Sequence, residues 1–103
     1  MVTFPTPSSV APGIIDTLPL NALRPGAQAT IVHLHTPEDD GDREVLLRLT
    51  EIGFLPGETV RIVARAGGGR EPIAVRLGGQ STFALRRREA VLVQVQPEPG
   101  AAA

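Results

Sequence analysis

Residues 48–57 read RLTEIGFLPG, and this stretch contains the end of a helix and the turn that follows it. Gly53 stands directly after the last helix-compatible residue, where a left-handed C-cap is expected because glycine has no Cβ to oppose positive φ. Pro56 and Gly57 then form a turn signal, since proline presets φ and glycine tolerates φ above zero. The stretch therefore predicts a helix that stops sharply and reverses the chain.

Upstream of this stretch, the sequence predicts a helix over residues 43–52. Four apolar residues recur at helical spacing and would form one buried stripe: Val45, Leu46, Leu49 and Ile52. Arg48 and Glu51 fall on the other side of the predicted helix. Asp42 is the expected N-cap because its short carboxylate can accept a bond from a free backbone N–H.

The rest of the chain alternates like short antiparallel strands. The predicted strands are Ala27–His35, Thr59–Ala66, Pro72–Leu77, Ser81–Leu85 and Ala90–Gln96. In the second of these, Val60, Ile62 and Ala64 should share one face. We therefore expect a mainly β protein, a small barrel of about five short antiparallel strands with one inserted helix. Residues 18–96 form the barrel domain, residues 1–17 a flexible proline-rich lead, and residues 97–103 a disordered tail.

Composition excludes several classes of function. The 103 residues include no cysteine, which removes thiolate metal sites and cysteine nucleophiles, and the formal net charge is −1. No window holds the roughly 20 apolar residues that a membrane span requires. No nucleophile, base and acid stand at usable spacing, so we expect no enzyme activity.

Four landmarks in register resemble the FeoA family of ferrous-iron transport accessory proteins. The sharpest is residues 48–57, and the others are Leu23–Gly26 with Ala29 and Ile31, Pro72–Val75, and Ala84–Arg86 followed by Glu89 and Ala90. The resemblance implies an SH3-like barrel in the cytoplasm that reaches the inner membrane through its partner, the membrane ferrous iron transporter FeoB. It implies docking on the cytosolic part of FeoB, with an effect on its activity or assembly, and no required cofactor. A homodimer is a candidate assembly for so small a core.

Two sets of residues are candidates for the docking surface. The first lies at the helix end and its turn, here called the elbow: Leu49, Ile52, Phe54, Leu55 and Pro56. Of these, Phe54 is expected to be exposed, because it follows the helix cap where the chain reverses, and an exposed aromatic side chain can anchor a partner. The second set is Arg86 and Arg87 in the basic run 86–88.

A rival hypothesis is a metal sensor or chaperone. His33 and His35 are the only histidines, and Glu38 and Asp39 follow closely. Imidazole with carboxylate suits Fe(II) or Zn(II). Both histidines share the strand phase of the apolar residues before them, so they can reach a metal only if the strand bulges or has left the core.

The remaining rival is a nucleic-acid-binding barrel that uses Arg86, Arg87 and Arg88. The sequence contains no tyrosine or tryptophan to stack on bases, and its net charge is near neutral. An acidic protein surface is therefore the favoured target of this basic run, and nucleic acid is not an expected partner.

Overall fold

The computed structural model describes residues 17–65, 72–78 and 81–98. Its strands and helices, in chain order, are β1 (Leu18–Pro19), β2 (Gln28–Leu34), α2 (Asp40–Ile52), β3 (Thr59–Arg65), β4 (Ile73–Leu77), β5 (Ser81–Leu85), α3 (Arg87–Ala90) and β6 (Val93–Pro97), with a 3-10 turn at Leu20–Ala22. The predicted lead, the tail and the glycine-rich connection between β3 and β4 lie largely or wholly outside the described residues.

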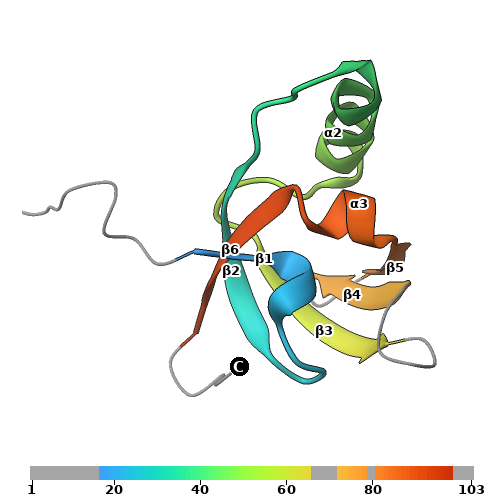
Figure 1. The fold of residues 1–103 in the computed structure, drawn as a ribbon. Helices are drawn as coiled ribbons and strands as arrows, with labels where there is room; N and C mark the ends of the chain where they lie inside the picture. Colours follow the sequence, from blue (N-terminus) through green and yellow to red (C-terminus); the bar gives the residue numbers. More distant parts are fainter. Residues whose placement is uncertain (1–16, 66–71, 79–80, 99–103) are drawn as a thin grey trace, which may run out of the picture.

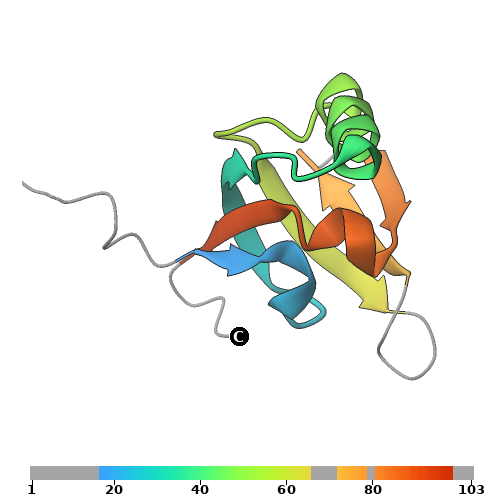
Figure 2. The same cartoon turned by 45° about the horizontal axis from the view of Figure 1, so that its top comes forward.

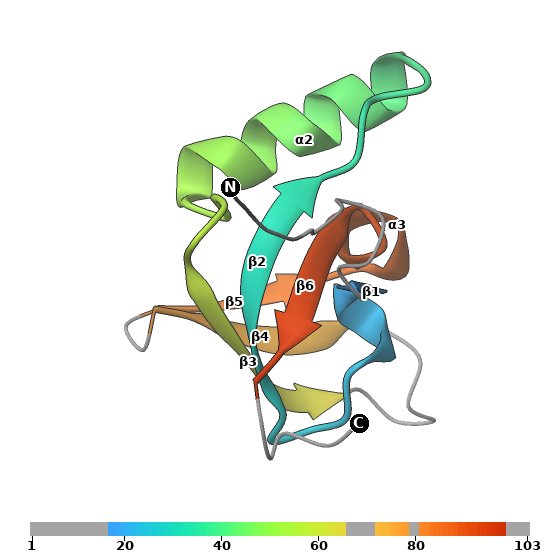
Figure 3. The ribbon, with the colours of Figure 1, turned by 90° about the vertical axis from the view of Figure 1, so that its left-hand side faces the viewer.

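Within the described ranges, six strands form one antiparallel sheet in the order β1-β6-β2-β3-β4-β5. Figure 3 shows β2 and β6 side by side and antiparallel, with β2 running toward α2 and β6 away from it, while β4 and β5 cross behind them. Figure 2 shows α2 at one end of the curved sheet. The prediction of a mainly β barrel with one inserted helix is confirmed. The structure adds one strand to the five predicted, the two-residue β1, and a single helical turn, α3, precedes β6 (Figure 1).

The ends of α2 are determined by two local residues. Gly53 has φ of 111° and caps the C-terminus, as predicted. The N-cap is Asp39 rather than Asp42: the Asp39 carboxylate accepts from the Asp42 backbone N–H at 2.7 Å. The helix consequently begins three residues earlier than expected, since residues 40–42 supply its first turn.

The core lies inside the curved sheet and is closed by the apolar stripe of α2. Leu49 is buried, and Val45 and Ile52 pack against the core. Val60 and Ile62 point inward as predicted, but Ala64 is exposed. The ladder between β3 and β4 shifts register between Ile62 and Ala64, and such a bulge reverses the phase of every residue beyond it.

Candidate functional site

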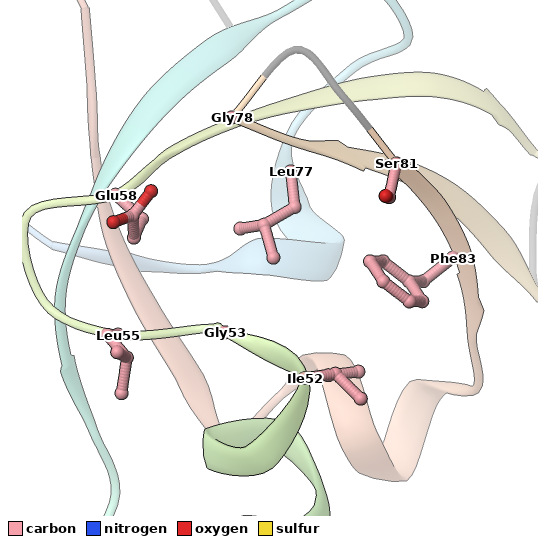
Figure 4. A pocket seen from close by; sticks show the side chains of 8 residues that line it. All are labelled: Ile52, Gly53, Leu55, Glu58, Leu77, Gly78, Ser81 and Phe83. Atoms are coloured by element: carbon pink, nitrogen blue, oxygen red, sulfur yellow. The ribbon is translucent and has the colours of Figure 1, made fainter.

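A groove opens where the C-terminal end of α2 meets β4 and β5. It has a volume of about 290 Å³ and is lined by Ile52, Gly53, Leu55, Glu58, Leu77, Gly78, Ser81 and Phe83. Figure 4 shows the Leu77 and Phe83 side chains reaching into the space between the sheet and the helix end, with Ile52 opposite them. We call this feature the elbow groove. Its side chains come from the helix, the elbow and two strands, so it exists only in the folded chain.

The shape of the groove depends on Gly53. A Cβ at this position would stand 3.2 Å from the Leu77 side chain, and the positive φ also disfavours any other residue. The second turn ties the elbow to the sheet, because the Gly57 N–H donates to the Ile31 carbonyl at 2.8 Å. The helix end and β4 can therefore approach each other closely enough to form two walls of one groove.

Phe54 is not the exposed anchor that the sequence predicts. Its side chain is 0% exposed, and its ring packs edge-to-face on Phe83 with centroids 5.8 Å apart. The Phe54 N–H donates to the Leu49 carbonyl, which continues the helix cap and turns this residue inward. The next residue, Leu55, is 42% exposed and lines the groove. The expectation of an exposed Phe54 is wrong because the left-handed cap directs the following side chain into the core.

The other predicted docking residues divide between core and surface. Leu49 is fully buried, and Ile52 is partly buried and lines the groove. Pro56 is exposed on the elbow. Arg86 and Arg87 are exposed at α3 and do not line the groove. The elbow and the basic run are therefore two separate surface features.

Residues from β4 and β5 complete the groove, and sequence reasoning missed them. In the sequence, Leu77 and Phe83 are ordinary apolar strand residues, and no local pattern indicates that either of them lies beside the end of the helix. Glu58 is also part of the lining. Within the described ranges its carboxylate makes no ion pair and no hydrogen bond. The groove thus has a mixed lining, in which apolar side chains from α2, β4 and β5 stand beside one unpaired negative charge.

Arg48, predicted on the solvent side of the helix, has a structural role. It forms an ion pair with Glu89, a carboxylate that is nearly buried on α3. Glu89 also accepts from the Arg86 backbone N–H at 2.7 Å. These bonds hold α2 against α3 and satisfy a carboxylate that would be costly to bury alone.

The two histidines stand outside the core because β2 contains a bulge. The β2–β6 ladder shifts register between Ile31 and His33, and both His33 and His35 are exposed, with ring centroids 6.1 Å apart. The His35 ring is hydrogen-bonded to Gln94, since the two Nε2 atoms lie 2.9 Å apart.

The acidic residues of the predicted metal set are placed differently. The Asp39 carboxylate caps α2, and Glu38 lines a shallow recess with His35. In the ranges that the structure describes, no three histidine, aspartate or glutamate side chains are gathered as a metal site. The four predicted ligands are therefore close in sequence without converging on one point.

The fold and the groove define a small SH3-like β protein with an inserted helix and an open groove beside it. The FeoA domain model matches residues 18–97, so the chain belongs to the FeoA family, which is linked to ferrous iron transport. No helix among the described residues is both long and apolar enough to cross a membrane. No curated protein sequence matches the chain.

Solved structures agree with this assignment. FeoA from Stenotrophomonas maltophilia, crystallised with zinc, is 36% identical over 79% of this chain and 89% of that one, with a TM-score of 0.65. Iron(II) transport protein A from Clostridium thermocellum is 34% identical over 81% of this chain and 47% of that one, also with a TM-score of 0.65. A manganese-dependent transcriptional repressor shares the fold, at 22% identity over 87% of this chain and 39% of that one, with a TM-score of 0.68.

Proposed function

We propose that this protein is an accessory subunit of bacterial ferrous iron transport that docks on the cytosolic part of FeoB and alters its activity or assembly. The observation that carries the proposal is the elbow groove, an open groove of mixed lining beside the most family-like stretch of the sequence, with the exposed Leu55 in its wall. The mechanism is a binding equilibrium: docking favours whichever conformational state of the transporter binds more tightly.

Leu55 is the best single contact for such a partner. It is the most exposed of the apolar side chains that line the groove, whose lining also includes the half-buried Phe83 and Leu77. Fully burying an exposed leucine contributes about 1.5–3 kcal/mol, and covering the 42% of Leu55 that is exposed contributes roughly half of that or less. The buried Phe54 supports this surface from below and does not touch the partner.

A pull-down from membranes of the native organism tests the proposal. The tagged protein should recover FeoB, and Leu55→Asp should abolish recovery. The matched control is Leu47→Asp, since Leu47 is 60% exposed on α2 and does not line the groove. Circular dichroism must show both variants folded. Failure of the unchanged protein to recover FeoB at every nucleotide and iron level would contradict docking, and equal recovery by both variants would contradict the groove.

Metal binding is a second candidate function, supported by the β2 bulge. The bulge turns both histidines outward, and their rings lie close enough for two ligands of one ion. Calorimetric titration with Zn(II) or Fe(II) should give heat that disappears in a His33→Ala/His35→Ala double variant. The matched control is the single variant Glu44→Gln, at an exposed residue of α2. Unchanged binding in the double variant would rule out this site.

A further inference from the structure

Two arginines stand directly opposite each other on the outer face of the sheet. Arg61 of β3 and Arg76 of β4 are register partners, so their side chains leave the same face, and both are exposed. Gln28 of β2 pairs with Arg61, and Thr82 of β5 pairs with Arg76. These four residues form one row across four strands, here called the arginine row. The Arg61 guanidinium donates to Gln28 Oε1 at 2.9 Å.

This arrangement leaves positive charge uncompensated. Like charges directly opposite each other in an antiparallel pair are destabilising. Within the part of the chain that the structure describes, neither Arg61 nor Arg76 forms an ion pair. Glu98 accepts from the Gln28 side-chain amide at 3.0 Å and so lies at the β2 end of the row, away from Arg76. The centre of the row is therefore suited to an anion.

An apolar recess lies beside the arginine row. Ala64, Ala74 and Ala84 are successive register partners and form the next outward row on the same strands. They line a recess of about 240 Å³ together with Arg65, Pro72 and Ile73. Val63, which is displaced by the β3 bulge, is 44% exposed on the same strand. The outer face thus offers two cations next to a shallow aliphatic surface.

We propose that this outer face binds an acidic protein segment. A carboxylate of the segment sits between Arg61 and Arg76, where guanidinium groups can make charge-assisted hydrogen bonds to it. A neighbouring apolar side chain of the segment enters the alanine recess.

Two features favour protein over nucleic acid as the partner. The recess is aliphatic and offers no aromatic platform on which a base could stack. Glu98 also ends the row with a negative charge, which opposes a continuous phosphate chain. The site is distinct from the elbow groove, because successive strand residues face opposite ways: Leu77 lines the groove, whereas Arg76 faces outward.

Fluorescence anisotropy of a labelled peptide with alternating glutamate and leucine tests this site in the full chain at low salt. Arg61→Gln/Arg76→Gln should weaken binding by about tenfold or more, because charge-assisted hydrogen bonds are lost. The control Arg24→Gln/Arg43→Gln removes the same charge from exposed positions elsewhere and should change binding by less than about twofold. Equal weakening in both variants, or no binding by the unchanged protein, would overturn the proposal.

Two further probes test the recess and the class of partner. A peptide with serine in place of leucine should bind at least about fivefold more weakly, because its side chain gains little from the apolar recess. Equal affinity for the two peptides would overturn the role of the recess. Single-stranded DNA that binds more tightly than the peptide, and loses binding in Arg61→Gln/Arg76→Gln, would overturn the choice of a protein partner. Thermal unfolding should show the row variant no less stable, since the substitution removes a like-charge contact.

Discussion

Phe54 and Leu55 are neighbours in the sequence but have opposite environments. Phe54 is wholly enclosed against Phe83, whereas Leu55 lies at the surface of the elbow groove. A substitution at Phe54 would therefore report on folding, and only a substitution at Leu55 can report on docking. At the scale of single residues, one position therefore separates a buried aromatic side chain from the exposed leucine that we propose as the partner contact.

Phe54→Ala should lower the free energy of unfolding by about 3–5 kcal/mol, the usual loss when a buried phenylalanine is truncated. Leu55→Ala should change it by less than about 1 kcal/mol, because much of that side chain is already in water. Urea denaturation followed by circular dichroism measures both values. A Phe54→Ala variant as stable as the unchanged protein would show that the ring is not part of the core.

At the scale of elements, helix α2 is held by contacts at both of its ends. Asp39 caps the N-terminus, Gly53 ends the helix, and the Arg48–Glu89 ion pair fixes its side against α3. The apolar stripe sets which face is buried. Because the groove wall includes Ile52 and Gly53, any loosening of the helix end would also deform the groove.

Asp39→Ala should destabilise the protein by about 1 kcal/mol, since the Asp42 N–H loses its acceptor at the helix N-terminus. Glu44→Ala is the matched control: it removes a negative charge from an exposed position of the same helix without removing a cap, and a change within about 0.5 kcal/mol is expected. Thermal unfolding of the two variants measures both changes in stability. An equal loss of stability in both variants would show that the negative charge, and not the helix cap, accounts for the destabilisation by Asp39→Ala.

At the scale of the whole molecule, one sheet carries the two proposed binding surfaces on its two faces. Inward-facing residues at the end of β4 and β5 build the elbow groove, while outward-facing residues of β3, β4 and β5 carry the arginine row and the alanine recess. The core itself runs from Leu20 to Val95. The residues that line the groove and the recess, and the two arginines of the row, therefore all lie in the segment that matches the FeoA domain.

A chain that starts at residue 17 should fold with the same stability as the full chain, because all the core residues found among the described ranges lie between Leu20 and Val95. The thermal midpoint and the urea midpoint should both agree with those of the full chain within experimental error. A marked decrease in either midpoint would show that residues 1–16 contribute to the folded domain, against the expectation of a flexible lead.

The sequence alone determined the helix, its glycine cap, the Pro-Gly turn, the approximate positions of the five longer strands and the FeoA family, because these depend on local spacing and on short motifs. Tertiary structure decided the rest. The bulges in β2 and β3 turned the histidines and Ala64 outward, and the chain reversal after Gly53 carried Phe54 inward. The groove and the arginine row join residues from separate strands, and their register depends on long-range pairing that no local pattern encodes.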